Sequence, residues 1–115
     1  MNFYTVIIIP YDLKKYNITT IYIGGGTPSF IESDYIKEII NVIQNKLEKN
    51  DTRWEDIEIT IEANPGTITL EKLNDYKTAG INRISLGLQA TQDRLLKQIG
   101  RIHNYKDFLE AYELL

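Results

Sequence analysis

Strand-like and helix-like stretches alternate along this chain, and that alternation limits the folds it can adopt. Four short runs are rich in β-branched and aromatic residues, at 4–9, 20–23, 57–61 and 83–88. Apolar residues at helical spacing follow two of these runs, at 34–47 and 70–79. Strand and helix in alternation are typical of parallel βα units. We therefore expect an α/β fold with parallel βα repeats.

The expected helices carry recognisable start and stop signals. Side chains with a short hydroxyl or amide group begin helices by accepting a backbone hydrogen bond, and glycine ends them in a left-handed conformation. A short helix is also expected to end at Gly100, and a last helix runs to the C-terminus. The expected N-caps are Ser33, Thr69, Thr91 and Asn104, and Gly80 is the expected C′ residue of the second helix.

Two features indicate one partial domain over residues 1–115. Only about ten residues separate the first two strand-like runs, whereas a parallel crossover takes a dozen or more. The chain also stops inside a helical pattern, so the expected sheet keeps open edges through which copies could associate as a homo-oligomer. We expect a piece of a larger fold.

Composition excludes several classes of function. The formal net charge is −3, which argues against nucleic-acid binding, because such proteins carry basic patches. No apolar run is long enough for a membrane helix, so we expect a cytoplasmic chain without membrane contact. The cysteine count is 0, which excludes disulfides and any thiolate-ligated zinc or iron–sulfur site built from this chain alone.

A glycine-rich turn, GGGTPS at residues 24–29, directly follows the strand-like run at 20–23. Glycines permit positive φ and close backbone approach, so the exposed amides and carbonyls of Gly24, Gly25, Gly26 and Thr27 can surround a small polar ligand. The alternative is a tight turn without a ligand. A phosphate-binding P-loop is excluded, because its G-K-[ST] ending is missing.

Polar residues also follow the other two expected strands. Glu62 comes directly after the run at 57–61, and Gln89 follows the run at 83–88, with Arg101 beyond it. Carboxyl ends of parallel strands meet at one edge of a sheet, where α/β folds place ligand sites. The alternative for Glu62 is a solvated turn residue. His103 is interpreted as a surface or cap histidine, and none of the eight tyrosines is given a catalytic role. The tyrosines expected in the core or at its rim are Tyr4, Tyr22, Tyr35, Tyr76 and Tyr112.

Four blocks of the sequence, in order, resemble a known family. They are residues 21–30, 58–66, 79–89 and 100–103. These blocks look like those of the radical S-adenosylmethionine enzymes of the oxygen-independent coproporphyrinogen III oxidase family, and especially of its haem-chaperone branch. The resemblance covers the chain from about Thr19 onward.

The resemblance implies a partial (βα)6 barrel of the TIM type, here a fragment of one. Full-length relatives hold a [4Fe–4S] cluster with three cysteines of a C-x3-C-x2-C loop and bind S-adenosylmethionine at the cluster. Reductive cleavage gives a 5′-deoxyadenosyl radical, which the oxidase uses to decarboxylate the propionates of its porphyrinogen. Porphyrin or haem is the partner that the resemblance implies for full-length relatives.

The same resemblance implies the cofactor residues. By motif, the turn that binds S-adenosylmethionine would comprise Gly24, Gly25, Gly26 and Thr27. Further polar contacts, to that cofactor or to a second copy of it, would come from Glu62, Gln89 and Arg101. A zwitterionic methionine end suits backbone dipoles, a carboxylate and a guanidinium.

The sequence departs from the family where the cluster is bound. Asp12 stands where the first cysteine is expected, and no cysteine follows. The resemblance thus implies that the cluster loop and most of the first helix are missing. Without three thiolates we expect no cluster, no radical initiation, no catalytic residue and no metal site in this chain.

Two other interpretations stay open. The chain could bind S-adenosylmethionine, or another small anion, without catalysis, because the glycine turn and Glu62 are intact. It could also be a structural fragment that self-associates through its open sheet edges.

Overall fold

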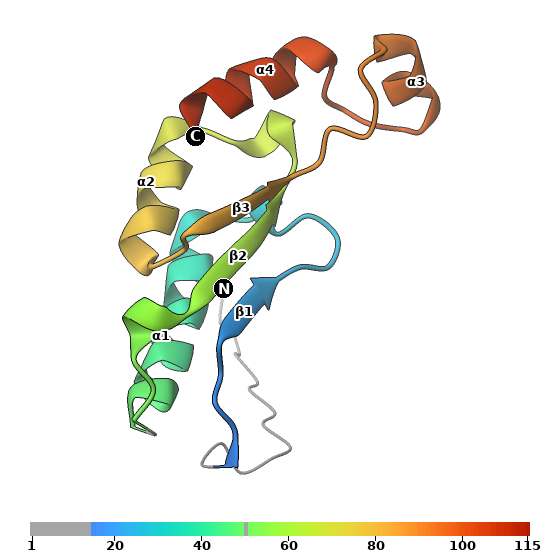
Figure 1. Cartoon of the computed structure of the whole chain (residues 1–115). Helices are drawn as coiled ribbons and strands as arrows, with labels where there is room; N and C mark the ends of the chain where they lie inside the picture. The colour runs from blue at the N-terminus through green and yellow to red at the C-terminus, as the bar shows by residue number, and fades with distance from the viewer. Residues whose placement is uncertain (1–14, 50) are drawn as a thin grey trace.

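Three parallel strands, joined by helices, form the centre of the protein (Figure 1). This computed structural model describes residues 15–49 and 51–115. The strands are β1 (Thr20–Ile23), β2 (Glu58–Ala63) and β3 (Arg83–Leu86), and they pair in the order β1-β2-β3. The expected parallel βα repeats are therefore confirmed. The strand expected over 4–9 lies outside the described residues.

In the described residues, the elements that connect and follow the strands are four α-helices and three 3₁₀ turns. Their order shows one helix after each of the first two strands and two helices after the third. In Figure 1, α3 projects away from the sheet, whereas α4 lies above α2. The helices are α1 (Ser33–Glu48), α2 (Leu70–Ala79), α3 (Asp93–Gln98) and α4 (Tyr105–Leu114), and the 3₁₀ turns are η2 (Pro28–Phe30), η3 (Trp54–Asp56) and η4 (Pro65–Thr67).

The two faces of the sheet differ because side chains alternate along a strand. Register pairs Ile23 with Ile61 and Ile61 with Ile84, and these residues pack with α1 and α2 in one core. On the other face, Tyr22 pairs with Thr60 and Glu62 pairs with Ser85. One face is therefore apolar and covered, and the other is largely polar.

The core lies between the sheet and helices α1 and α2. Its buried residues come mainly from α1, from β2 and from α2 with the turns that flank it, and α4 contributes Ala111. Ile61 and Ile40 are almost completely buried, and Tyr76 of α2 contributes the largest buried side chain. No helix in the described parts of the chain has the length and hydropathy needed to span a bilayer.

Helix ends follow the expectations at three positions. Thr69 accepts a hydrogen bond from the Lys72 amide at 3.2 Å. Gly80 ends α2 in the left-handed region, with φ 103°. Asn104 and Asp107 form a reciprocal capping box at the start of α4.

Two expected caps are wrong. Ser33 is the first residue of α1 and its hydroxyl bonds Asp75 of α2, so Glu32 occupies the N-cap position without a side-chain bond. Helix α3 begins at Asp93 with Gln92 as N-cap, one residue later than a Thr91 cap would place it. A distant partner takes the hydroxyl in the first case, which the local pattern cannot reveal.

Two expected strands also have different ends. Strand β2 extends to Ala63, beyond the expected end at residue 61. Strand β3 stops at Leu86, short of the expected end at residue 88, and the chain leaves the extended conformation by Gln89, which has φ 70°. A positive φ is incompatible with a β-strand.

Candidate functional site

A cavity of about 250 Å³ opens at the carboxyl edge of the sheet. Residues from all three strand ends line it, as expected for a site in a parallel α/β fold. Its volume is just below the range of about 300–1,000 Å³ that is usual for small-molecule pockets. The lining residues are Gly26, Thr27, Glu62, Ala63, Asn64, Ser85, Gly87, Gln89 and Arg101.

The glycine-rich turn after β1 uses its glycines in two ways. Gly25 and Gly26 have positive φ, 94° and 62°, and open space where a Cβ would stand. At Gly24 an added Cβ would lie 2.9 Å from Cε1 of Tyr22 and 3.2 Å from Oε2 of Glu62. Gly24 is thus required by close packing, whereas Gly25 and Gly26 are required by their backbone conformation.

A tyrosine holds the carboxylate at the centre of the site. The Tyr22 hydroxyl donates a hydrogen bond of 2.6 Å to Oε1 of Glu62. That bond, followed by partial burial and the negative charge of Glu62, raises the pKa of Tyr22 above its usual value. Ser85 and Arg83 act in the opposite direction, without cancelling the rise. The phenol of Tyr22 therefore stays protonated beside the side chain of Glu62.

Tyr22 does not line the cavity but contacts the candidate site through Glu62, and the sequence analysis missed this contact. Tyr22 was interpreted as a core or rim residue, but its side chain is 58% exposed and lies against Glu62. The pairing of β1 with β2 reveals this contact. Tyr22 is the register partner of Thr60, and Glu62 lies two residues further along β2 on the same face of the sheet. That argument needs the β1–β2 register, which no single strand supplies.

Gln89 and Arg101 come to the cavity from the segment after β3. Gly87 continues the pairing with β2, because its amide donates to the Ala63 carbonyl at 3.1 Å. An added Cβ at Gly87 would lie 3.1 Å from Nε2 of Gln89. Within the described part of the chain, neither Arg101 nor Glu62 is engaged in an ion pair. The cavity thus offers one positive and one negative side chain.

His103 does not have the surface or cap role expected of it. It is buried, with 2% of its surface exposed, and Nε2 lies 3.1 Å from the Leu88 carbonyl oxygen. Because a carbonyl oxygen only accepts, Nε2 carries the proton. Nδ1 is buried and has no partner in the described residues. Through this hydrogen bond, His103 connects the loop that contains Arg101 to the segment that contains Gln89.

The cavity gathers most of the residues expected to form the cofactor site. Gly26, Thr27, Glu62, Gln89 and Arg101 all line it. Gly24 and Gly25 belong to the same turn but do not line the cavity. Sequence reasoning missed Ala63, Asn64, Ser85 and Gly87 as lining residues, although Ser85 could have been found as the register partner of Glu62.

Known proteins resemble this chain in both sequence and structure. The family model described as the radical SAM superfamily matches residues 8–115. The haem chaperone HemW of Buchnera aphidicola subsp. Acyrthosiphon pisum is 45% identical over 101 residues, which cover 86% of this chain and 25% of that protein. HemW of Escherichia coli is 39% identical over 97 residues, or 84% of this chain and 25% of that protein.

A solved structure shows the same arrangement of strands and helices. The coproporphyrinogen III oxidase HemN of Escherichia coli, described as a radical SAM enzyme, superposes with a TM-score of 0.69 and 25% identity. The superposition covers 84% of this chain and 21% of that one, so the three βα repeats correspond to a fragment of its partial barrel. The chain spans about a quarter of the length of these curated relatives. This chain belongs to the radical SAM superfamily, in the part of it that is similar to haem chaperones and coproporphyrinogen III oxidase.

Proposed function

We propose that this chain binds S-adenosylmethionine in the cavity at the carboxyl edge of its sheet. The observation that carries the proposal is the meeting of Glu62, Arg101 and the glycine-rich turn in one cavity. Membership of the radical SAM superfamily supports the choice of ligand.

The charges of the cavity suit the methionine end of this ligand. Its carboxylate can accept two parallel hydrogen bonds from the Arg101 guanidinium, and its ammonium can donate to Glu62. The side-chain amide of Gln89 offers both a donor and an acceptor. Backbone amides of the turn at 24–27 supply further donors, because positive φ at Gly25 and Gly26 leaves them outside any strand pairing.

The iron–sulfur cluster of the superfamily does not fit the side chains of this chain. The cysteine count is 0, so the three thiolates of a cluster loop cannot come from it. In the ranges 15–49 and 51–115, no three histidine, aspartate or glutamate side chains gather as metal ligands. We infer that the chain as it stands binds its ligand without starting radical chemistry.

Haem or a porphyrin is the partner that we propose for the larger protein to which this chain corresponds. The names of the relatives support this, since HemW is a haem chaperone and HemN a coproporphyrinogen III oxidase. The choice between chaperone and oxidase concerns that whole protein. The cytoplasm is the proposed compartment.

Isothermal titration with S-adenosylmethionine tests the proposal. Glu62→Ala should weaken binding at least tenfold, about 1.4 kcal/mol. Glu58→Ala is the matched control, because Glu58 lies on the same strand and the same face but at the opposite end of β2. No heat with the wild-type chain, or equal affinity in the Glu62 variant, would contradict the proposal.

A second pair of variants tests the glycine-rich turn. Gly25→Val should abolish binding, because a β-branched side chain resists the φ of 94° found there. Gly66→Ala in the neighbouring turn is the control, because its φ is outside the positive region and the new Cβ would make an ordinary contact of 3.5 Å with Asn64. Circular dichroism of both variants separates lost binding from lost folding.

A further inference from the structure

Two serines, four residues apart, connect the first βα unit to the second. Ser29 is completely buried in η2, and Ser33 is 8% exposed at the start of α1. The Ser29 hydroxyl contacts the turn after β2, whereas the Ser33 hydroxyl contacts α2. The two serines therefore link the same pair of units at different places, one beside the cavity and one away from it.

The hydrogen bonds around Ser29 form a closed ring whose direction follows from counting protons. The Asn64 amide donates to Oγ of Ser29 at 3.1 Å. Oγ1 of Thr67 donates to the Asn64 carbonyl oxygen at 2.7 Å. A hydroxyl has only one proton, so Thr67 must accept in its contact with Ser29, and the Ser29 hydroxyl donates. Every polar group of the ring is satisfied.

The ring adjoins the cavity, because Asn64 belongs to both. Ser29 is two residues after Thr27, and Asn64 is two residues after Glu62. Thr27, Glu62 and Asn64 line the cavity, but Ser29 does not. The Ser29 carbonyl oxygen also accepts a hydrogen bond from Nζ of Lys72 in α2, which adds a second tie between the units.

We propose that Ser29 is a positioning residue for the cofactor site, which fixes the glycine-rich turn at its distance from Glu62. The inference rests on the proposed function. Oγ of Ser29 is the atom that bonds both the amide of Asn64 and the hydroxyl of Thr67, and nothing else in the described residues joins these two turns through a side-chain hydroxyl. Its loss leaves the buried Asn64 amide without a partner, removes the hydrogen bond that Thr67 accepts and frees the two turns to move apart.

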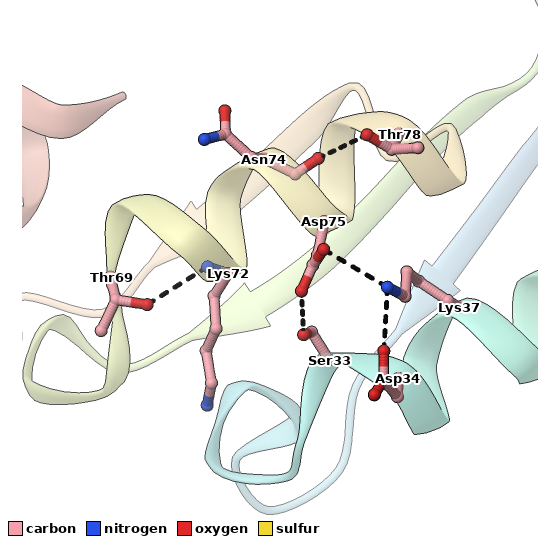
Figure 2. A network of polar contacts seen from close by, with 8 residues as sticks. All are labelled: Ser33, Asp34, Lys37, Thr69, Lys72, Asn74, Asp75 and Thr78. Carbon is pink, nitrogen blue, oxygen red and sulfur yellow. Dashed lines mark hydrogen bonds and ion pairs between the residues drawn. The ribbon is translucent and has the colours of Figure 1, made fainter.

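Ser33 supplies the matched control. Its hydroxyl donates to Asp75, which Lys37 also contacts, and this network joins α1 to α2 (Figure 2). None of the three residues lines the cavity. Ser33→Ala removes a tie between the same two units while leaving the turns of the cavity as they are.

The experiment compares two pairs of variants by titration with S-adenosylmethionine. Ser29→Ala should weaken binding at least tenfold, and Ser33→Ala should change it less than twofold. Thr67→Val removes the Thr67 hydroxyl from the ring and should also weaken binding at least tenfold. Thr67→Ser keeps a hydroxyl there and should bind like the wild type. If Ser29→Ala does not fold, the comparison of Thr67→Val with Thr67→Ser tests the proposal instead.

Amide hydrogen exchange separates this inference from the proposed function. The Phe30 amide bonds the Thr27 carbonyl oxygen at 2.9 Å and reports on the first turn, and the Asn64 amide reports on the second. Both should exchange at least tenfold faster in Ser29→Ala and Thr67→Val than in Ser33→Ala. No binding by the wild type contradicts the proposed function, and the exchange result then decides the role of Ser29.

Two results would overturn the inference. One is equal weakening of binding in Ser29→Ala and Ser33→Ala, which would show a general effect of stability. The other is unchanged exchange of Phe30 in both Ser29→Ala and Thr67→Val, which would show that the ring does not hold the first turn.

Discussion

The hydrogen bond between Tyr22 and Glu62 gives the candidate site a titration signal of its own. Hydrogen bonding to Glu62 stabilises the neutral phenol, so the pKa of Tyr22 lies above its ordinary value of 10.0. We expect Glu62→Gln to lower this pKa, because the amide carries no charge. Carbon-13 NMR of labelled tyrosine rings across alkaline pH measures it.

The control for this titration is Glu58→Gln, at the far end of the same strand face. It should leave the Tyr22 pKa raised. The direction of the pKa shift also predicts how stability depends on pH. Because the pKa of Tyr22 is raised in the folded state, the contribution of the Tyr22–Glu62 pair to stability is present below about pH 10 and is lost as the pH rises through the folded pKa. A Tyr22 pKa that is the same in the wild type and Glu62→Gln would contradict the assignment.

Single residues were predictable where their role follows from the strand end alone. Glu62 could be expected in the site because carboxyl ends of parallel strands share one edge. Tyr22 could not, because its contact with Glu62 crosses between strands and depends on register. Nor could the burial of His103, which arises because the loop after α3 folds back on Leu88. A lone histidine carries no periodic signal.

A second residue, Tyr76, is buried without a hydrogen bond for its hydroxyl in the described part of the chain. Burial, followed by the charge of Asp75, raises the pKa of its phenol. Tyr76→Phe should raise the free energy of unfolding by about 1 kcal/mol, because the hydroxyl loses water on folding and gains no partner. Urea denaturation measures this, with the exposed Tyr112→Phe as a neutral control. A lower stability for Tyr76→Phe would reveal a partner for this hydroxyl.

At the scale of elements, local signals predicted helix ends well only where no distant partner competes. The signals at Thr69 and Asn104 are confirmed, since each side chain bonds an amide of its own helix. Ser33 had the same local signal, but its hydroxyl bonds Asp75 instead. Tertiary contacts thus override the cap preference, and the single sequence does not record them.

The contact between α1 and α2 should make the protein sensitive to acid. The hydrogen bond from Ser33, aided by Lys37, holds the pKa of Asp75 below its ordinary value of 3.8. Because the folded pKa is lowered, the stabilisation is present above about pH 4 and is lost as the pH falls through the folded value. In Asp75→Asn, stability should fall less as the pH is lowered. In Asp34→Asn, which changes the exposed partner of Lys37, it should fall as in the wild type. Thermal unfolding between neutral and acidic pH tests the difference; equal acid slopes in the two variants would contradict it.

At the scale of the whole molecule, the topology and the edge that carries the site followed from the sequence, because alternation of strand and helix dictates a parallel sheet. The composition of the cavity did not follow. Ser85 and Asn64 enter it through the register of β2 with β3 and through a 3₁₀ turn that no periodicity indicates. The cramped joint after the first expected strand falls largely outside the described residues, so that expectation stays a prediction.

Exposed apolar surface leads to the last prediction, that this chain self-associates in solution. A groove of about 730 Å³ runs between α2, β3 and the end of α4, and Leu70, Ile84 and Leu115 are among its lining residues. In the described part of the chain β3 has a strand neighbour on one side only, so its other edge offers unpaired backbone groups beside this groove.

Sedimentation velocity over a range of protein concentrations tests this expectation. The average mass should rise with concentration, because association removes both the groove and the open edge from water. Leu70→Lys should shift the equilibrium toward the monomer, since Leu70 is 58% exposed within the groove. Leu109→Lys, at an exposed leucine of α4 outside the groove, should not. A strictly monomeric wild type would show that the exposed edge and groove are compatible with an isolated chain, and the self-associating fragment would then be excluded.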